Sequence, residues 1–250
     1  MNDVVTFDQV TFRYENEDTL LDALSFTVKA GEFVSIVGAS GTGKSTIFRL
    51  IVGLEEPIAG TIYLNGQKED NRLGKVGYMP QQDLLVPWRT IIDQISLPLE
   101  AEGKRLNRQQ LLTQLQAVGL GEVADAYPKS LSGGMRQRVS FLRASQRESS
   151  LLLLDEPFSA LDAMTKLHMQ KWLLKQWQLT QSAVLFITHD ISEAIYLSDK
   201  IFVIHDKPIQ QVEVIDVPLS RPRNHQQLDS KLAIQLKNQL LQSIKVQGFE

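Results

Sequence analysis

The sequence contains no cysteine, which excludes disulfide bridges and thiolate catalysis and fits a reducing compartment. It also lacks an apolar run near the roughly 18–20 residues of a membrane-spanning helix. The longest runs, residues 151–154 and 183–187, have the length of a strand. The N-terminus does not show the basic-then-apolar layout of a signal peptide, and the net charge of −3 gives no basic excess for nucleic-acid binding. We therefore expect a cytoplasmic chain that reaches a membrane only through a partner.

The 250 residues are 43% hydrophobic and 22% charged, which is an ordinary balance for a globular chain of one large or two small domains. Apolar and polar residues alternate in residues 4–14 and 23–30, and this predicts an N-terminal antiparallel sheet with one solvated face. Residues 33–37 are instead almost continuously apolar, as in a buried parallel strand.

Apolar strands return at residues 151–157, 183–190 and 200–206, with a helix at about 162–179. Strands that alternate with helices predict an α/β fold with a parallel sheet covered on both faces. Residues 87–148 have helical character and form an insertion between two of these strands.

In the insertion, residues 107–120 have apolar residues at helical spacing, and glycines end the segment. Its apolar face contains Leu111, Leu115 and Val118, and Gly119 and Gly121 end it.

The C-terminal tail carries an apolar residue at every fourth position, which predicts an amphipathic helix. These residues are Leu228, Leu232, Leu236, Leu240 and Ile244. The helix either docks on its own domain, which we favour, or binds a partner.

Residues 38–45 match the pattern G-x-x-x-x-G-K-[ST], with a strand before them and a helix from about Lys44 after them. The glycines allow successive backbone N–H groups to face phosphate oxygens, and the helix N-terminus adds positive partial charge. Lys44 supplies a full charge at the β- and γ-phosphates, and the Ser45 hydroxyl is suited to Mg²⁺. The alternative is a glycine-rich turn without a ligand.

Polar residues follow two of the apolar strands. Asp155 ends one strand and is a candidate for holding Mg²⁺ through its water shell, and Glu156 is a candidate base for the attacking water. His189 follows another strand and is a candidate for a γ-phosphate contact. A short strand is also expected at residues 75–80, and Gln81 or Gln82 after it could place an amide near the metal, although either fits a polar turn.

Ser132, Gly133 and Gly134 precede a helical segment that begins near Met135. They fit a second phosphate contact, because a capping hydroxyl and exposed backbone N–H groups favour anions, but they equally fit an ordinary helix N-cap. No lysine or metal-binding acid accompanies them, so they do not form a second complete site.

The motifs GASGTGKST, LSGGMRQR, LLLLDEPFSALD and FITHD occur in this order. Together they resemble the ATP-binding subunit of ATP-binding cassette (ABC) transporters over residues 4–215. The resemblance implies a P-loop NTPase core with an N-terminal antiparallel β-subdomain and an inserted α-helical subdomain. It implies one ATPase domain at 4–218, followed by a tail at 219–250. It also implies a homodimer in which two subunits enclose two ATP molecules head to tail, each signature motif contacting the γ-phosphate bound by the opposite subunit.

The resemblance assigns roles residue by residue. Tyr14 is expected to stack on adenine, unless it only packs in the sheet. The other residues expected to bind ATP are Gly38, Ala39, Ser40, Gly41, Thr42, Gly43, Lys44, Ser45 and Thr46. The signature residues, facing the partner's ATP, are Leu131, Ser132, Gly133, Gly134, Met135, Arg136 and Gln137. The loop at the dimer interface is Ser159, Ala160, Leu161 and Asp162. The expected metal ligands are Ser45, Gln81 and Asp155, and the catalytic group comprises Lys44, Gln81, Glu156 as base and His189 as switch. Gln81 fits better than Gln82, because Pro87 then lies at the usual offset.

Residues 84–100, 131–144 and 155–166 resemble bacterial importers for nitrate, sulfonates, taurine and thiamine-pyrimidine precursors. These importers usually have a run of small residues where this sequence has residues 141–150. This difference weakens the assignment of one of these cargoes to the chain. The resemblance implies permease subunits, an extracytoplasmic solute-binding protein, no nucleic acid, and a peripheral place on the cytoplasmic face of the cell membrane. The alternatives are a nucleic-acid-linked ABC ATPase, an exporter ATPase and a small-molecule kinase.

Overall fold

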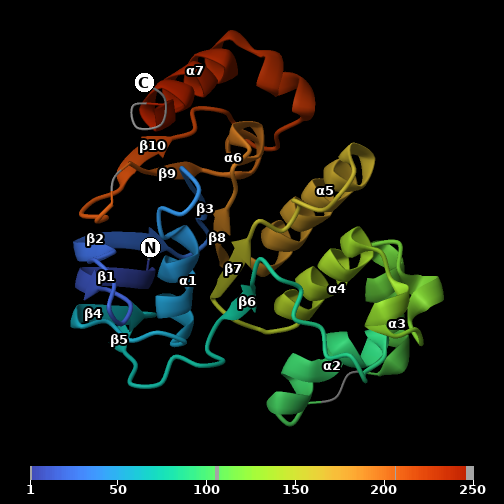
Figure 1. Ribbon diagram of the computed structural model, residues 1–250. Coiled ribbons are helices and arrows are strands. Elements are labelled where there is room, and N and C mark those ends of the chain that lie inside the picture. The colour runs from blue at the N-terminus through green and yellow to red at the C-terminus, as the bar shows by residue number, and fades with distance from the viewer. Residues whose placement is uncertain (1, 105–106, 206, 246–250) are drawn as a thin grey trace. The chain divides into compact units, whose positions relative to one another are not determined.

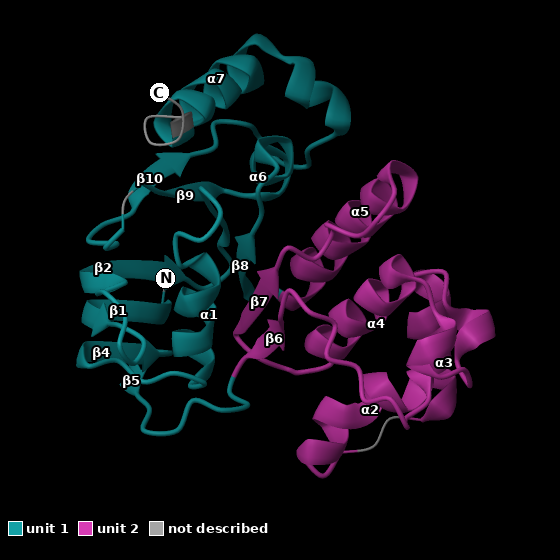
Figure 2. Cartoon of the chain, in the orientation of Figure 1, with its two compact units in different colours: residues 1–75, 181–250 teal, residues 76–180 magenta. Residues whose placement is uncertain are grey.

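Two segments far apart in the chain, residues 1–75 and 181–250, build one compact unit, and residues 76–180 build the other (Figures 1 and 2). We call them unit 1 and unit 2. The computed structural model describes residues 2–104, 107–205 and 207–245. The predicted helical insertion, 87–148, falls inside unit 2. The extent of the ATPase domain, 4–218, stays a prediction.

The N-terminal part of unit 1 is an antiparallel sheet with the strand order β2-β1-β4-β5. Its strands are β1 (Asp3–Phe12), β2 (Leu21–Lys29), β4 (Ala59–Leu64) and β5 (Gln67–Lys68). Phe7 of β1 and Phe26 of β2 are register partners, and their rings stack with centroids 4.5 Å apart. The predicted N-terminal antiparallel sheet is therefore confirmed.

Unit 1 also contains a parallel arrangement in which β3 pairs with both β8 and β9. The strands are β3 (Phe33–Gly38), β8 (Ala183–Ile187), β9 (Lys200–Ile204) and β10 (Glu213–Asp216), the last antiparallel to β9. The residues of β8 are all buried, and so are those of β3 up to Val37, which is why both sequences read as continuous apolar runs. The parallel pairing expected from these runs is confirmed, whereas β10 has no counterpart in the sequence analysis.

The described residues of unit 1 also form three helices and a short 3-10 turn. They are α1 (Lys44–Val52), α6 (Ile191–Leu197), η3 (His225–Asp229) and α7 (Lys231–Lys245). Ala233, Leu236 and Leu240 of α7 are buried against a cluster that includes Ile195 of α6 and Val203 of β9. Thus the C-terminal amphipathic helix docks on its own unit, which is the favoured alternative. Two residues of the predicted apolar face differ: Leu232 is 43% exposed, and Leu228 lies in η3, before the helix begins.

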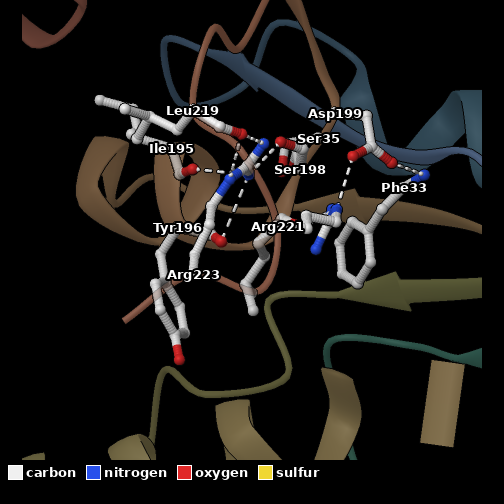
Figure 3. A network of polar contacts seen from close by, with 10 residues as sticks. Phe33, Ser35, Ile195, Tyr196, Ser198, Asp199, Leu219, Arg221 and Arg223 are labelled. Carbon is white, nitrogen blue, oxygen red and sulfur yellow. Dashed lines mark hydrogen bonds and ion pairs between the residues drawn. The ribbon is translucent and has the colours of Figure 1, made fainter. Parts of the chain in front are cut away.

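Two arginines of the C-terminal segment connect it to the core of unit 1 (Figure 3). Arg221 Nε donates to Asp199 Oδ1 at 2.7 Å, and Asp199 Oδ2 accepts from the backbone N–H of Phe33 at 3.0 Å. Arg221 Nη2 also donates to the carbonyl of Leu197 at 2.6 Å. The tail is therefore hydrogen-bonded to the end of α6, and Asp199 links it to the start of β3.

Arg223 is buried at the C-terminal end of α6, where the last carbonyls of a helix lack intrahelical partners. Its Nη1 donates to the carbonyls of Ile195, at 3.0 Å, and of Ser198, while its Nε donates to the carbonyl of Leu219 at 3.0 Å. Burial, with a smaller contribution from the charge of Arg221, lowers the pKa of Arg223 to about 10. Arg223 thus caps α6 with a charge that is costly to bury.

We expect Arg223→Met to destabilise the protein by about 2–3 kcal/mol, because buried carbonyls lose a charged donor. The melting temperature should fall by roughly 5–10 °C for a chain of this size. Arg49→Met is the matched control, since Arg49 is 47% exposed and its ion pair with Glu55 is a surface pair. That control should cost less than about 1 kcal/mol. Thermal melts followed by circular dichroism compare the two, and equal shifts would contradict the capping role.

In the part of unit 2 that the structure describes, two parallel strands are combined with four helices and two 3-10 turns. They are β6 (Gly77–Met79), α2 (Ile91–Ala101), α3 (Arg108–Ala117), η1 (Gly121–Val123), η2 (Pro128–Ser130), α4 (Gly133–Ser145), β7 (Leu151–Asp155) and α5 (Ala163–Thr180). Helix α4 contacts α2, α3, β6 and β7. The helical character predicted for 87–148 is confirmed, and so is the buried face formed by Leu111, Leu115 and Val118.

Candidate functional site

The phosphate-loop motif connects β3 to α1 in unit 1. Gly43 is the N-cap of α1 with a φ of 101°, and a Cβ there would lie 2.9 Å from Leu20. A Cβ on Gly38 would lie 2.6 Å from the carbonyl oxygen of Ile204. Only glycine fits both positions, and Gly43 has no side chain to accept the first N–H groups of α1. A helix start without a side-chain cap suits a bound anion.

Lys44, the first residue of α1, is buried, and its ammonium group is directed back over the loop. Its Nζ donates to the carbonyls of Ala39 at 2.6 Å and Gly38 at 3.1 Å. The loop therefore holds the cation that the motif requires beside its own backbone. This is the placement from which Lys44 can reach a bound phosphate.

Tyr14 lies beside the first turn of α1. Its hydroxyl group is 3.1 Å from Thr46 Oγ1, and its ring packs edge-on against Phe12 with centroids 4.9 Å apart. The structure thus places Tyr14 next to the phosphate-loop helix while also packing it against the sheet. Both readings of this tyrosine fit the contacts, and its role toward adenine stays a prediction.

His189 follows β8 and emerges at the same sheet edge as the phosphate loop, because β8 and β3 are parallel neighbours with Ile187 opposite Ile36. The turn around His189 is held on both sides. Thr188 Oγ1 donates to the buried carboxylate of Glu193 at 2.6 Å and accepts from the N–H of Asp190 at 3.0 Å. Within unit 1 the end of β8 therefore lies at the sheet edge from which the phosphate loop starts, and the contact of His189 with a γ-phosphate stays a prediction.

The acidic pair lies in unit 2, at the end of β7. Asp155 is buried, and Glu156 follows it with a φ of 49°, in the left-handed region that non-glycine residues rarely adopt. Glu156 Oε2 accepts from Gln81 Nε2 at 3.4 Å. The structure thereby brings together Gln81 and Glu156, which lie 75 positions apart in the sequence.

Helix α4 begins at the signature motif. The exposed Ser132 is its N-cap and accepts from the N–H of Met135 at 3.3 Å, as in an ordinary capped helix. Arg136 donates to Asp83 Oδ2 at 2.9 Å and to the carbonyl of Leu131 at 2.8 Å. Ser132 faces solvent, whereas Arg136 and the buried Gln137 contact residues of their own unit.

The loop after Glu156 packs against the start of α4. Ser159 Oγ donates to the carbonyl of Glu156 at 3.0 Å, and a Cβ on Gly134 would lie 3.1 Å from the carbonyl oxygen of Ala160. Asp162 Oδ1 accepts from the N–H of Thr165 at 3.0 Å and so caps the start of α5. Hydrogen bonds from the Thr165 side chain and backbone lower the pKa of Asp162.

Several of these residues line one hollow of unit 2. They are Gln81, Gly133, Arg136, Gln137, Ser159 and Ala160. Within the described residues, the structure contains no group of three or more His, Cys, Asp or Glu side chains arranged to hold a metal. Nor does any helix in the same described part of the chain have the length and apolar character needed to cross a membrane.

Three further residues shape these turns and were not predicted from the sequence in this role. They are Arg143, Glu193 and Gln137, which contacts the turn at Glu156. Arg143 donates to the carbonyls of Asp83 at 2.7 Å and Leu84 at 2.8 Å, and burial lowers its pKa. A buried arginine, glutamine or glutamate has no local sequence signature, because its partners lie elsewhere in the chain.

A glycine-lined phosphate loop between a parallel strand and a helix, with Lys44 turned over it, defines a P-loop nucleotide-binding protein. The ABC transporter family profile matches residues 21–159, more than half of the chain. The chain therefore belongs to the ABC transporter family, and it is an ATP-binding, ATP-hydrolysing subunit.

Relatives and solved structures agree with this assignment. The chain is 44% identical to the formylaminopyrimidine import ATP-binding protein ThiZ of Halalkalibacterium halodurans, over 87% of this chain and 86% of the relative. It is 38% identical to the aliphatic sulfonates import ATP-binding protein SsuB of Bacillus thuringiensis, over 92% and 90%. The solved dimer of the ATP-binding cassette MJ0796, in a post-hydrolysis state with ADP and Pi, is similar with a TM-score of 0.77 at 30% identity. That match covers 86% of this chain and 100% of the solved chain.

Proposed function

We propose that two copies of this chain form the ATP-hydrolysing motor of a bacterial importer, bound to permease subunits on the cytoplasmic face of the membrane. One observation carries the proposal: a complete phosphate loop and a signature helix that contacts the Glu156 turn occur in the same chain. A kinase or a simple nucleotide-binding protein has no use for an exposed Ser132-Gly133 beside such a turn.

In this proposal, each residue of the site has a separate role in ATP hydrolysis. Lys44 and the N–H groups of residues 38–46 neutralise and position the phosphates, and Tyr14 supports adenine. Glu156 orients the attacking water and accepts its proton, while His189 contacts the γ-phosphate from the neighbouring strand end. The rate enhancement comes from positioning and charge neutralisation, which is the general pattern for this reaction.

Mg²⁺ fits the donors that the chain offers. Magnesium in nucleotide sites takes phosphate oxygens and waters with only one or two protein ligands, so a cage of several acids is not required. The Ser45 hydroxyl, the Gln81 amide oxygen and the buried Asp155 carboxylate are hard oxygen donors of the kind that Mg²⁺ prefers. When bound, Mg²⁺ would neutralise charge on the β- and γ-phosphates.

The head-to-tail homodimer is supported by the exposure of Ser132 and Gly133 at the start of α4. A helix N-terminus of this kind suits an anion supplied from outside the chain, which here is the γ-phosphate held by the second copy. In the same arrangement, Ser159, Ala160, Leu161 and Asp162 form the loop at the subunit interface. The dimeric state of the similar cassette MJ0796 also favours this proposal.

Contact with the permease is assigned to the segment before α2. Trp88 is 78% exposed and Leu84 is 60% exposed, and large apolar side chains of this kind are enriched at protein interfaces. Arg136 and Arg143 of the signature helix hold Asp83 and Leu84, so movement of this segment reaches α4 directly. A solute-binding protein outside the membrane would select the cargo, with formylaminopyrimidines and aliphatic sulfonates as the first candidates.

The test is reconstitution of the chain with its permease in lipid vesicles. ATP hydrolysis should rise when the cargo-loaded binding protein is added, and uptake of a formylaminopyrimidine or an alkanesulfonate should identify the cargo. Trp88→Ala should keep the basal hydrolysis rate and lose the stimulation, whereas Tyr127→Ala, another exposed aromatic of unit 2, should keep both. Unstimulated hydrolysis in the wild-type complex, or no uptake of any cargo, would contradict the importer.

A further inference from the structure

Gln137 lies one turn into the signature helix, and its side chain is 6% exposed. A buried amide of this kind must have partners for both its donor and its acceptor groups. Both groups find them in the turn that follows β7, within the same unit. This placement separates Gln137 from Ser132 and Gly133, which are exposed at the start of the same motif.

The contacts of Gln137 involve three residues of that turn. Its Nε2 donates to the carbonyl of Glu156 at 3.0 Å and to Ser159 Oγ at 3.1 Å. Its Oε1 accepts from the N–H of Ala160 at 3.0 Å. Ser159 Oγ in turn donates to the carbonyl of Glu156 at 3.0 Å, which closes a small network around that carbonyl.

The Glu156 backbone needs such support. Its φ of 49° places a residue with a long side chain in the left-handed region, and such a conformation persists only where the surroundings hold it. The hydrogen bonds of Gln137 and Ser159 end on the carbonyl oxygen of this residue. They therefore fix the peptide plane that sets the direction of the Glu156 side chain.

We infer that Gln137 is a positioning residue, which holds the main chain of Glu156 so that the carboxylate stays aligned with Gln81 and the attacking water. The inference rests on the proposed role of Glu156 as the base. It also gives the signature helix a second task. The same helix that offers Ser132 to the partner's ATP fixes the base of its own subunit and the first residues of the interface loop, so both respond together when α4 moves.

The test compares Gln137→Met with Gln146→Met. Methionine keeps the length of the side chain and removes both hydrogen-bonding groups. Gln146 is a matched control, because it ends the same helix, is buried, and donates to Gln114 Oε1 at 2.6 Å outside the turn. We expect Gln137→Met to lower kcat for ATP hydrolysis on the order of 10²-fold with KM for ATP nearly unchanged. Gln146→Met should lower the melting temperature comparably and leave kcat near the wild-type value.

The variant Gln137→Glu tests the hydrogen-bond donor of the Gln137 side chain separately from its acceptor. It keeps an oxygen for the N–H of Ala160 and loses the donor to the carbonyl of Glu156, so kcat should fall as in Gln137→Met although the helix stays packed. Adding Gln137→Met to Glu156→Gln should cause no further loss, since the two changes remove one function.

Equal losses of kcat in Gln137→Met and Gln146→Met, or wild-type kcat in Gln137→Glu, would overturn the positioning role and leave the proposed function standing. An inactive wild-type chain in the presence of its permease would instead remove the proposed function itself. A kcat loss confined to the Gln137 variants, with KM unchanged, supports the inference.

Discussion

Glu156→Gln is expected to bind ATP normally and to lower kcat for hydrolysis by about 10²- to 10⁴-fold, the range lost with a general base. Glutamine has nearly the shape of glutamate but cannot accept the proton of the attacking water. The phosphate loop, which lies in the other unit, is unchanged, so binding of ATP should persist. Phosphate release measures the loss of turnover, and size-exclusion chromatography with ATP should show a trapped dimer.

Glu148→Gln is the control for this experiment. Glu148 belongs to the same unit, is 86% exposed and forms a surface pair with Lys104 at 3.2 Å. The replacement removes one carboxylate without touching the turn after β7, so turnover should be unchanged. Normal hydrolysis by Glu156→Gln would remove Glu156 as the base, and a comparable loss in Glu148→Gln would point to a general effect of charge.

The phosphate loop was predictable because its chemistry is local. Residues 38–45 are contiguous, and glycines at fixed offsets between an apolar strand and a helix leave few conformations. The same holds for α3, whose apolar spacing and the following Gly119 mark a helix and its end. Capping at Ser132 was also foreseen as one of two readings, and the structure shows the cap while contact with a second ATP stays a prediction.

Contacts between distant residues were not predictable in this way. Gln137 and Glu156 are separated by 19 positions, and Arg223 and Ile195 by 28. A buried polar side chain gives no periodic signal, so sequence patterns treat it as an ordinary helix-surface or loop residue. Only the tertiary structure shows that these side chains satisfy backbone carbonyls at a turn and at a helix end.

The C-terminal segment illustrates the same limit. Its leucine spacing predicted a helix, but β10 and the arginine network that attach the segment to unit 1 went unrecognised. Strand β10 has four residues, of which only Ile215 is buried, and it is defined by its pairing with β9. Docking of the tail helix on its own domain was the favoured prediction, and Ala233, Leu236 and Leu240 do pack with Ala194 and Ile195. The strand pairing and the arginine contacts that accompany this docking are properties of the folded unit, so they could not be predicted.

Mixing two inactive variants should restore ATP hydrolysis if the composite site is correct. Lys44→Ala removes the phosphate-loop cation, and Ser132→Arg places a bulky side chain at the exposed start of α4, where the partner's ATP is proposed to bind. Each variant alone carries the same defect in both sites of its dimer, so each should be inactive. A mixed dimer has one doubly defective site and one site with wild-type Lys44 and wild-type Ser132.

Random mixing in equal amounts makes half of the dimers hybrid, and one of the two sites in each hybrid is intact. The mixture should therefore recover about a quarter of the wild-type rate if the sites act independently in a two-fold dimer. Lys44→Ala mixed with the double variant Lys44→Ala/Ser132→Arg is the matched control, since none of its dimers has an intact site. No recovery in the first mixture would mean that each chain completes its own site. Recovery in the control would mean that Lys44 is dispensable, and full activity of either single variant would mean that the residue it replaces is dispensable. Recovery only in the first mixture requires that Lys44 and Ser132 act on the same ATP from different chains.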